Sequence, residues 1–295
     1  MVTYNRTNFT HEGRVAYMLN RVVIKLSGEA LAGNTQTRDF VKSVLDEAVE
    51  HIDDGENVDD DYVDKTSRDF EKSILKLRFD DDVIENITGQ IVELMEEGVQ
   101  VALVVGGGNF WRGRDSKEDI EKVKSDQIGM MATVMNALYL ADMFAKKGVD
   151  AAIMTPVIIG TITQQFSKKA ALGCMNDKSV VIFAGGTGHP FFSTDTIAAI
   201  RTAELEADAL LFAKNVDGVY DSDPRQNNRA IKLKNITYRN IIENNLTVID
   251  TAASAICEEQ KILSIIFELN EPGAITRIVK GNDEDIYAIG TKVTV

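Results

Sequence analysis

The chain has 295 residues, and 44% of them are apolar, which is enough to bury a sizeable core in one large domain or two small ones. Its formal net charge of −14 argues against nonspecific nucleic-acid binding, because phosphates would be repelled overall, but it leaves room for a local basic pocket. Two cysteines far apart in sequence exclude a disulfide framework, and no CxxC pair is present to hold zinc.

The amino terminus and the apolar runs bear on location. The first residues, MVTYNRTNFTHEGRV, lack the apolar core of a signal peptide. No apolar run approaches the ~20 residues that a membrane-spanning helix needs. We therefore expect a soluble, cytoplasmic protein that binds neither membrane nor nucleic acid.

Short apolar runs rich in β-branched residues recur along the chain and are typical of buried strands. They predict strands at 22–26, 101–105, 151–154, 180–184, 209–213 and 262–267. Helical patterns lie between these runs. Such alternation predicts an α/β fold with a mostly parallel central sheet, in which ligands bind beyond the carboxyl ends of the strands.

Three of the intervening stretches predict helices in detail. In 80–97, apolar residues share one face, and Gly98 suits the carboxyl-terminal stop. In 125–147, Ser125 is a plausible N-cap, and Thr194 is a plausible cap for a later helix. The second helix carries an apolar stripe whose methionines we expect in the helix core: Ile128, Met131, Met135 and Leu138.

Residues 34–76 interrupt the alternation with a high density of Asp and Glu, including HIDDGENVDDDYVDK. We interpret this segment as a solvated surface insertion, part helix and part loop. A calcium site is the alternative, because calcium loops are acidic. The required spacing, with Gly at the sixth position and Glu at the twelfth, is absent.

Three glycine-containing segments follow predicted strands: KLSGEALAG (25–33), GGGNFWRGR (106–114) and AGGTGHPFFSTD (184–195). Glycine lets backbone N–H groups approach an anion, and a helix that starts just afterwards adds the positive end of its dipole. Three such turns at one sheet edge could hold more than one phosphate. No GxxxxGK[ST] occurs, which excludes a P-loop, and the missing GxGxxG argues against a dinucleotide fold.

Lys25 lies inside the apolar run VVIKLSG, just before the first glycine turn. A lysine there must reach solvent or meet a negative partner, and a transferring phosphoryl group would be such a partner. The alternative is an edge-strand lysine that extends to water. Asp195 ends the third glycine segment, where it could cap a helix or orient Lys25 through an ion pair.

Several long segments together resemble the bacterial uridylate (UMP) kinases of the amino-acid-kinase superfamily. They are KLSGEAL, VVGGGNFWRG, DQIGMMATVMN, AGGTGHPFFSTDT, NVDGVYDSDP and the late VID followed by FELNEPGAITRIV. The resemblance covers roughly 20–33 and 78–285. It implies a three-layer α/β/α sandwich with a mainly parallel sheet, as one domain over 1–295 with an N-terminal extension (1–20) and the acidic insertion (about 34–76).

The resemblance also implies an activity. It is the transfer of the γ-phosphoryl group of ATP to UMP, with Mg2+, giving UDP and ADP in pyrimidine nucleotide biosynthesis. Members of this family are homohexamers under allosteric control, with GTP as the usual activator and UTP as the usual inhibitor.

Site residues follow from the matching motifs. Lys25 would contact the transferring group, Asp195 would organise Lys25, and Arg112 would bind phosphate near the transfer point. The ATP side would comprise Lys25, Leu26, Ser27, Gly28, Gly108, Arg112, Asn215, Tyr220 and Asp223. The UMP side would comprise Gly107, Asp126, Thr187, Gly188, His189, Pro190, Phe191, Phe192, Ser193 and Thr194. No residue is assigned as a metal ligand, and we expect Trp111 to pack over its loop rather than stack on a base.

The sequence departs from this family at three places. His189 stands where the family has Asn, and the insertion of about forty residues follows GEALAG near the family's effector site. The pair Lys214–Asn215 replaces the common Thr-Lys, so the adenine contact could belong to either residue.

Two other functions stay open. One is a different amino-acid-kinase member that phosphorylates a carboxylate or carbamate, against which GTGHPFFSTD and GMMATVMN argue. The other is a non-catalytic nucleotide sensor, against which the joint presence of Lys25, Arg112 and Asp195 argues.

Overall fold

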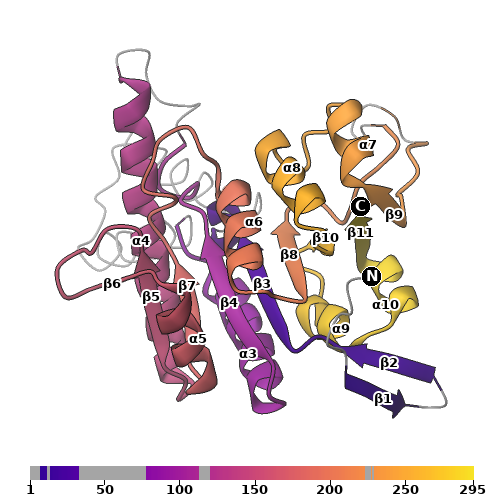
Figure 1. The fold of residues 1–295 in the computed structure, drawn as a ribbon, viewed down its shortest axis with the longest axis horizontal. Helices are drawn as coiled ribbons and strands as arrows, with labels where there is room; N and C mark the ends of the chain where they lie inside the picture. Colours follow the sequence, from indigo (N-terminus) through magenta and orange to yellow (C-terminus); the bar gives the residue numbers. More distant parts are fainter. Residues whose placement is uncertain (1–6, 12–13, 33–77, 113–119, 223–226, 228) are drawn as a thin grey trace, which may run out of the picture.

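The described part of the chain, residues 7–11, 14–32, 78–112, 120–222, 227 and 229–295, alternates between strands and helices in this computed structural model (Figure 1). The strands are β1 (Thr7–His11), β2 (Arg14–Met18), β3 (Arg21–Leu26), β4 (Gln100–Val105), β5 (Ala151–Thr155), β6 (Gln164–Gln165), β7 (Val180–Phe183), β8 (Ala209–Lys214), β9 (Asn235–Thr237), β10 (Ser264–Glu268) and β11 (Gly290–Thr294). The helices are the 3-10 helix η1 (Gly28–Leu31) and α3 (Asp81–Glu96), α4 (Lys122–Lys146), α5 (Lys168–Asn176), α6 (Thr194–Glu204), α7 (Tyr238–Glu243), α8 (Thr251–Glu259), α9 (Ala274–Lys280) and α10 (Asp283–Ile289).

Nine strands form one sheet in the order β6-β5-β7-β4-β3-β8-β10-β11-β9. Every pair from β6 to β10 is parallel. β11 runs antiparallel to β10, and β9 runs parallel to β11. The predicted α/β fold with a mainly parallel sheet is confirmed. Because the central strands are parallel, the loops after β3, β4, β7 and β8 all leave at one edge of the sheet.

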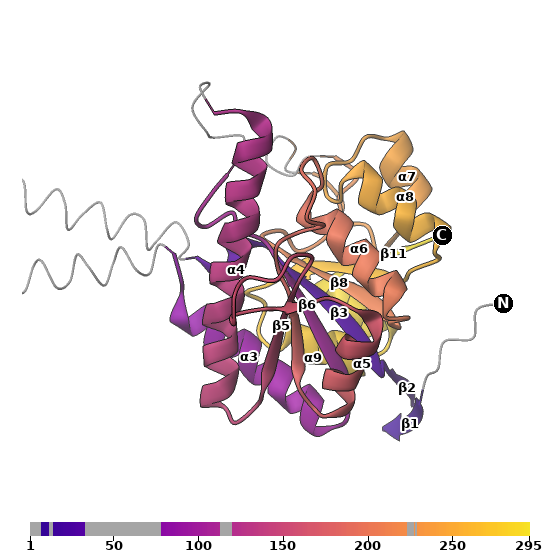
Figure 2. The same ribbon diagram turned by 60° about the vertical axis from the view of Figure 1, so that its left-hand side comes forward.

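Helices cover both faces of the sheet (Figure 2). The core on one face joins the strands to α3, α4, α9 and α10, and the core on the other joins them to α5, α6, α7 and α8. The alternation along β3 shows the division, since Ile24 belongs to the first core and its neighbour Val23 to the second. The architecture is therefore a three-layer α/β/α sandwich.

The six predicted strands are present as β3, β4, β5, β7, β8 and β10, with ends that differ from the prediction by one or two residues. The helix predicted over 80–97 is α3, which Asp80 caps by accepting from the backbone N–H groups of Asp82 and Val83. Gly98 adopts a φ of +91° just after this helix, as expected of a stop.

Two predicted caps are wrong. α4 begins at Lys122, so Ser125 lies in its first turn, where its hydroxyl accepts a hydrogen bond from Trp111 Nε1 at 3.0 Å. α6 begins at Thr194, and the preceding residue, Ser193, accepts from the Thr196 backbone N–H at 3.2 Å. Adjacent hydroxyl residues are chemically equivalent as caps, so residue type alone does not fix the first residue of a helix.

The expected core stripe of α4 is also wrong. Ile128, Met131, Met135 and Leu138 are 42%, 52%, 45% and 41% exposed. The buried face of the helix instead carries Ala132, Thr133, Val134, Asn136, Ala137, Leu140, Met143 and Phe144. α4 is apolar around most of its circumference, so its periodicity does not show which stripe meets the sheet.

α4 also qualifies the expectation about membranes. By length and composition alone it is apolar enough to cross a bilayer, and 44% of its most apolar 18-residue stretch is buried in this structure. Helices at the core of soluble proteins meet the same criteria, so this feature is weak support for a membrane segment.

The predicted extension and insertion are only partly within the described residues. In the extension, β1 and β2 form a separate two-stranded antiparallel hairpin. Residues 33–77, and with them the calcium alternative, lie outside the described part of the chain. The flanks of this segment are joined, because the Asp80 backbone N–H donates to the Leu31 carbonyl at 2.8 Å. The assignment of one domain with these two additions stays a prediction.

Candidate functional site

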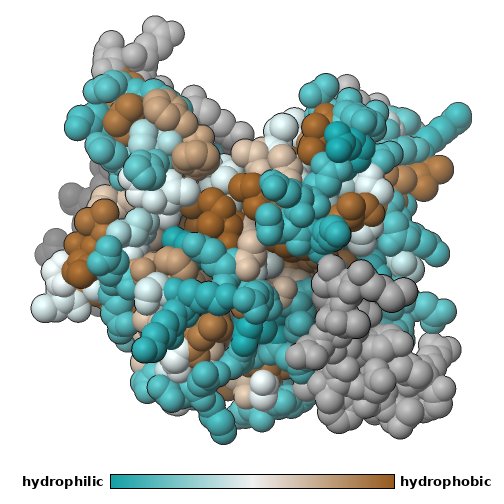
Figure 3. Space-filling model, viewed as in Figure 1, coloured by the Kyte–Doolittle hydropathy of each residue, from teal (hydrophilic) through white to brown (hydrophobic). Residues whose placement is uncertain are grey.

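The glycine segments and the charged residues predicted from the sequence meet at the carboxyl edge of the parallel strands. This edge is at the top of Figure 1, and Figure 3 shows the surface there hollowed between the α4 side and the side formed by α7 and α8. In parallel α/β sheets this edge is where ligands bind.

The turns after β3 and β4 pack backbone against backbone. A Cβ atom added to Gly28 would lie 2.4 Å from the Gly108 nitrogen and 2.9 Å from the Gly106 carbonyl oxygen. Only glycine fits there. Ser27 then starts η1 by accepting from the Ala30 backbone N–H at 3.2 Å. The two turns therefore form one rigid unit rather than two independent loops.

A buried amide pair holds the second turn against α4. Asn136 Nδ2 donates to the Gly106 carbonyl at 2.6 Å and to Asn109 Oδ1 at 2.8 Å, and Asn109 Nδ2 donates back to Asn136 Oδ1 at 2.9 Å. A Cβ on Gly107 would lie 2.7 Å from the Gly129 carbonyl oxygen and 2.8 Å from Ala132 Cβ. The second turn thus requires glycine because α4 approaches it so closely.

The loop after β7 depends on positive φ angles. Gly185, Gly186 and Gly188 have φ of +75°, +62° and +79°, and Phe191, which carries a side chain, has φ of +73°. α4 holds this loop at two points. The Gly185 backbone N–H donates to Thr133 Oγ1 at 2.7 Å, and the Phe191 backbone N–H donates to Asp126 Oδ2 at 2.8 Å.

Asp126 therefore joins α4 to the loop after β7. Partial desolvation raises its pKa, but hydrogen bonds from the Lys122 side chain and the Phe191 backbone outweigh desolvation, and the pKa ends below its ordinary value. The carboxylate is ionised at neutral pH and faces a cavity.

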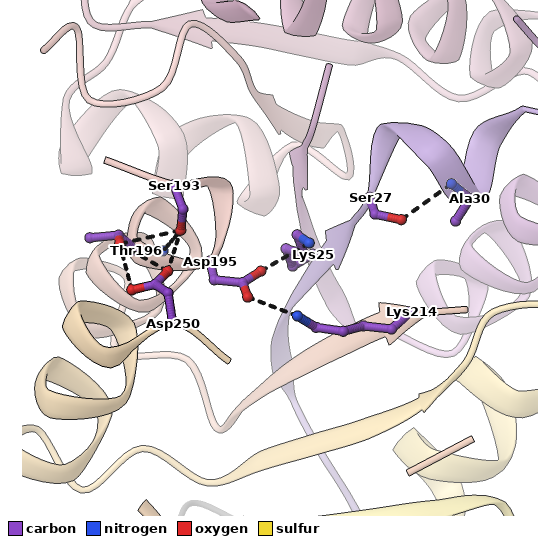
Figure 4. Close-up of polar contacts among 8 residues, drawn as sticks. All are labelled: Lys25, Ser27, Ala30, Ser193, Asp195, Thr196, Lys214 and Asp250. Carbon is purple, nitrogen blue, oxygen red and sulfur yellow. Dashed lines mark hydrogen bonds and ion pairs between the residues drawn. The ribbon is translucent and has the colours of Figure 1, made fainter. Parts of the chain in front are cut away.

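A cluster of three charged side chains lies at the centre of the edge (Figure 4). Lys25 Nζ lies 2.9 Å from Asp195 Oδ1, and Lys214 Nζ lies 2.8 Å from Asp195 Oδ2. Lys25 and Asp195 are both buried. Burial raises the pKa of Asp195, but the charges of Lys25 and Lys214 bring it below its ordinary value, so the carboxylate is ionised.

A second polar cluster joins the starts of two helices beside this trio. Asp250 caps α8 by accepting from the Ala253 backbone N–H at 2.8 Å. Its carboxylate also accepts hydrogen bonds from the Ser193 and Thr196 hydroxyls at the start of α6 (Figure 4). This contact fixes the helix start that presents Asp195.

Arg112 lies at the second turn and is held by two neighbours. Its Nε lies 3.1 Å from Glu29 Oε1 and donates to the Gly108 carbonyl at 3.2 Å. The Arg112 side chain is 30% exposed. It can therefore turn toward an anion at the edge without leaving a buried charge behind.

The described residues at this edge line two cavities. The smaller, of about 280 Å3, is lined by Gly107, Gly108, Trp111, Ser125, Asp126, Gly129, Met130, Thr133, Phe192, Ser193 and Thr194, with strand residues beneath. The larger, of about 860 Å3, is lined by Lys25, Ser27, Glu29, Lys214, Asn215, Asp217, Gly218, Tyr220 and residues of the 245–248 loop. Thr194 lines the smaller cavity, and the next residue, Asp195, holds Lys25, which lines the larger one. The trio thus separates the two.

Comparison with known proteins places this fold in a family. A sequence model of the amino acid kinase family matches residues 71–268. The chain belongs to the amino acid kinase family.

Individual relatives of this amino acid kinase are similar over nearly its whole length. A uridylate kinase of Limosilactobacillus reuteri is 38% identical over 266 residues, which is 90% of this chain and 94% of that protein. The crystal structure of UMP kinase from Bacillus anthracis superposes with a TM-score of 0.73 at 28% identity, covering 94% of this chain and 96% of that one. The crystal structure of UMP kinase from Ureaplasma parvum gives 0.71 at 31% identity, covering 94% and 99%.

The amino acid kinase fold brings most of the sequence-predicted residues to the edge. Gly107, Asp126, Phe192, Ser193 and Thr194 line the smaller cavity, and so does Gly108, which was predicted for the ATP side. Lys25, Ser27, Asn215 and Tyr220 line the larger. Leu26 is fully buried, so only its backbone could meet a ligand. Asp223 lies outside the described residues. The other residues predicted for the UMP side, 187–191, do not line the smaller cavity.

Several residues at the site were not predicted from the sequence. Asp250 caps α8 and contacts the start of α6, and Asn136 holds the second turn. Lys214, which the sequence offered only as an alternative adenine contact, completes the charged trio. Lys214 carried a usable signal, because it ends the apolar run ALLFAK as Lys25 nearly ends VVIKL. Asp217 accepts from Tyr220 Oη at 2.9 Å and pairs with Lys232 Nζ at 3.2 Å, which orients the tyrosine in the larger cavity.

Trp111 behaves largely as expected. Its indole N–H donates to Ser125, and it packs against Gly129 of α4, so it fixes the loop to the helix. It also lines the smaller cavity.

Proposed function

We propose that this protein is a UMP kinase that transfers the γ-phosphoryl group of ATP to UMP, giving UDP and ADP. The observation that carries the proposal is the pair of cavities on either side of the Lys25–Asp195 ion pair. The sequence and structural similarity to uridylate kinases supports the choice of UMP as acceptor.

Phosphoryl transfer from ATP to UMP needs little covalent catalysis by the protein. An oxygen of the UMP phosphate, already anionic at neutral pH, attacks the γ-phosphorus, and the bond from that phosphorus to the oxygen bridging to the β-phosphate breaks. ADP leaves with that electron pair. Such a transfer is accelerated mainly by alignment and by positive charge where oxygens crowd.

Residues at the edge supply both. Lys25 would place its ammonium against the transferring group, with Asp195 fixing its position. Backbone N–H groups of the turns at Gly28 and Gly107 would receive phosphate oxygens, because neither turn has a side chain that blocks approach. Arg112 would exchange its ion pair with Glu29 for a contact with phosphate near the transfer point.

We place UMP in the smaller cavity and ATP in the larger. Asp126 would accept hydrogen bonds from ribose hydroxyls, and the 187–194 loop would close around the UMP nucleoside and phosphate. Asn215 and Tyr220 would contact the adenosine, with Asp223 as the further residue predicted there. The larger volume suits the larger nucleotide.

Mg2+ would enter with ATP. Within the described residues, no three His, Cys, Asp or Glu side chains are grouped as a metal site. The donor set therefore fits a cation held chiefly by phosphate oxygens and water, which is how Mg2+ is commonly bound beside nucleotides. When bound, Mg2+ would offset charge on the phosphates.

Assembly, regulation and location complete the proposal. We propose a homohexamer, supported by the exposed apolar stripe of α4, and regulation by UTP inhibition and GTP activation. We propose a cytoplasmic enzyme of pyrimidine nucleotide biosynthesis.

A coupled assay for ADP release tests the activity, with UMP, CMP, aspartate, acetylglutamate and carbamate offered separately beside MgATP. We expect rapid turnover with UMP and much slower turnover with the others. Turnover only with an amino acid or carbamate would instead favour a carboxylate or carbamate kinase, and ATP binding without turnover would favour a nucleotide sensor. No observation at the site favours either alternative.

A further inference from the structure

One wall of the larger cavity is a single loop, residues 215–220, which follows β8 and is called the donor loop below. All six of its residues line the cavity, and the proposed function places the adenosine of ATP against Asn215 and Tyr220. A loop that is already held in its binding conformation pays less ordering entropy when a ligand binds. A residue that fixes the backbone of the donor loop therefore contributes to the affinity for the donor.

A closed ring of three hydrogen bonds joins the donor loop to β11, the strand at the carboxyl end of the chain. The Leu233 backbone N–H donates to the Val219 carbonyl at 2.8 Å. The Thr291 hydroxyl donates to the Leu233 carbonyl at 2.6 Å and accepts from the Val219 backbone N–H at 2.9 Å. Each of the three residues thus donates once and accepts once, which uses the single proton of the hydroxyl.

This ring is buried. Thr291 is fully buried, and Val219 is only 4% exposed. Hydrogen bonds linked in a poorly solvated place strengthen one another, and water cannot readily replace a partner that is lost. Without the Thr291 hydroxyl, a backbone N–H of the donor loop and the Leu233 carbonyl would each lose this partner.

The central sheet gives Thr291 a fixed position. Thr291 is paired with Ile266 of β10, and β10 is paired with β8, from which the donor loop emerges (Figure 1). The loop therefore leaves the sheet at β8 and is bonded back to it two strands away. The contact is close, because a Cβ atom added to Gly218 would lie 2.6 Å from Thr291 Oγ1.

A second contact holds the donor loop from the surface. Lys232 Nζ lies 3.2 Å from Asp217 Oδ2 and donates to the Ala288 carbonyl at 3.5 Å. The side chains of this ion pair are 25% and 40% exposed, and ion pairs near the surface contribute little. The buried hydroxyl of Thr291 is therefore the stronger of these two anchors.

We propose that Thr291 is a positioning residue for the phosphoryl donor, whose hydroxyl holds the donor loop in the conformation that binds the nucleoside of ATP. Thr291 is not among the residues that line the larger cavity, so it acts through the loop. Lys25 and Asp195 lie on β3 and α6, outside the ring, so the reacting centre keeps its geometry. This inference rests on the proposed function, since that function supplies the nucleoside triphosphate.

The test compares Thr291→Val and Thr291→Ser with the unchanged full-length enzyme in steady-state kinetics. Valine has nearly the shape of threonine but lacks the hydroxyl, and we expect KM for ATP to rise about tenfold because two backbone groups lose their partner. kcat and KM for UMP should stay within about threefold, since binding energy away from the reacting atoms is lost. Thr291→Ser keeps the hydroxyl and should hold KM for ATP within about threefold of the unchanged enzyme.

The control is Thr88→Val. Thr88 is also fully buried, and its hydroxyl donates to the Ile84 carbonyl at 2.8 Å within α3, away from both cavities. Its loss should leave KM for ATP within about twofold, because distant sites act independently. Chemical denaturation measures the stability of each variant. A smaller folded fraction lowers the apparent kcat without raising KM, and Thr291→Ala replaces Thr291→Val if the latter does not fold.

The role of Thr291 is overturned if the variant without the hydroxyl keeps the KM for ATP of the unchanged enzyme. It is also overturned if Thr291→Ser is impaired as much as that variant, or if Thr88→Val raises KM for ATP equally. An unchanged enzyme with no turnover on UMP would contradict the proposed function separately. Calorimetric titration with a non-hydrolysable ATP analogue and Mg2+ then decides, and equal affinity with and without the hydroxyl would overturn the role of Thr291.

Discussion

Lys25 interrupts the apolar run of β3 one residue before the strand ends, and within the described residues its ammonium group pairs with Asp195. Removing the ammonium would not leave Asp195 unpaired, since Lys214 contacts its other oxygen. Loss of Lys25 should therefore affect chemistry more than folding.

We predict that Lys25→Met lowers kcat about 1,000-fold, because the charge acts on oxygens that crowd only in the transition state. The affinity for UMP, measured by titration calorimetry, should change by less than about threefold, since the smaller cavity does not include Lys25. The control is Lys292→Met, since Lys292 has a side chain 17% exposed and an ion pair with Asp283 at 2.8 Å but lines neither cavity. Near-normal turnover of Lys25→Met would remove Lys25 from the mechanism.

Gly107 gives a second prediction at this scale, because its missing side chain is a steric requirement. Gly107→Ala would place a Cβ 2.7 Å from the Gly129 carbonyl oxygen, and neither backbone can yield easily. We expect a loss of about 1–3 kcal/mol in the free energy of unfolding, as in overpacked sites, and at least a tenfold loss in kcat/KM for UMP.

Gly89→Ala is the matched control for that substitution. Gly89 lies within α3 and has no atom within 4 Å of an added Cβ, so alanine there should stabilise the protein by about 0.5–1 kcal/mol. Chemical denaturation measures both variants. Equal stability of the two would show that the close approach to α4 is not a constraint.

Sequence reasoning found some of these residues and missed others for physical reasons. Lys25 stands out because a lysine in an apolar run needs a partner, and Asp195 stands out because it ends the third glycine segment. Lys214 was considered only as an alternative adenine contact, because nothing local shows that β8 lies next to β3. The sequence does not mark Asn109 and Asn136 as special, because their hydrogen bonds form only when the second turn packs against α4.

At the scale of elements, α4 and the loop after β7 act as one unit through Asp126. The carboxylate binds the Phe191 backbone N–H at 2.8 Å and pairs with Lys122. The pKa of Asp126 is below its ordinary value in the folded protein. Its contribution to stability is thus fully present above the ordinary pKa and is lost as the pH falls through the lower, folded-state pKa.

We predict that Asp126→Asn raises KM for UMP about 10- to 100-fold with a smaller effect on KM for ATP, because an amide cannot replace a carboxylate that accepts from two sides. Asp142→Asn is the control, as Asp142 also lies on α4 and forms an ion pair with the lysine four residues away, Lys146, at 2.8 Å. If the two variants have similar KM values for UMP, Asp126 does not contribute to the UMP site.

Strands were easier to predict than the orientation of helices. The runs that became β3, β4, β7 and β8 are buried on both faces, so hydrophobicity alone marks them. α4 presents apolar residues to the sheet and to solvent, and its pattern therefore suggested the wrong stripe. The short edge strands β6 and β9 have too few residues for a pattern of their own.

At the scale of the whole molecule, the described residues on the two sides of the acidic insertion are bonded to each other. The Leu31 carbonyl accepts from the Asp80 backbone N–H at 2.8 Å, and Asn109 Nδ2 donates to the Arg78 carbonyl at 2.8 Å. The return point of the insertion is thus bonded to the second glycine turn.

We predict that replacing residues 34–76 with a short Gly-Ser linker leaves basal kcat within about threefold, because the entropic cost of closing a loop changes only slowly with its length. Arg78 and Asp80 are retained in this variant. Any change should be confined to the response to GTP and UTP, measured in the same assay. Loss of basal turnover in a folded variant would show that the insertion belongs to the site.

The order of the sheet was beyond prediction from the sequence. Alternating strands and helices indicate parallel pairing, but they do not show that β3 lies between β4 and β8, or that β11 turns antiparallel at one side. These placements decide which loops meet. Local sequence therefore revealed the parts of the site, and long-range pairing determined which of them line each cavity.

The exposed stripe of α4 bears on assembly. Four large apolar residues at helical spacing, each more than 40% exposed, form a surface that a monomer rarely leaves uncovered (Figure 3 shows apolar patches at this side of the molecule). A second copy of the chain could cover the stripe with its own α4 across a two-fold axis, as in symmetric assemblies generally.

We predict that Met131→Glu combined with Met135→Glu converts the assembly to smaller species, because carboxylates would face one another across that axis. Light scattering after size exclusion would give a mass well above the 32.5 kDa of one chain for the unchanged protein, and a mass nearer one chain for the variant. Ile231→Glu is the control, since Ile231 is 66% exposed but stands apart from the stripe. If both variants keep the mass of the unchanged protein, α4 is not the contact, and a monomeric unchanged protein would rule out the homohexamer.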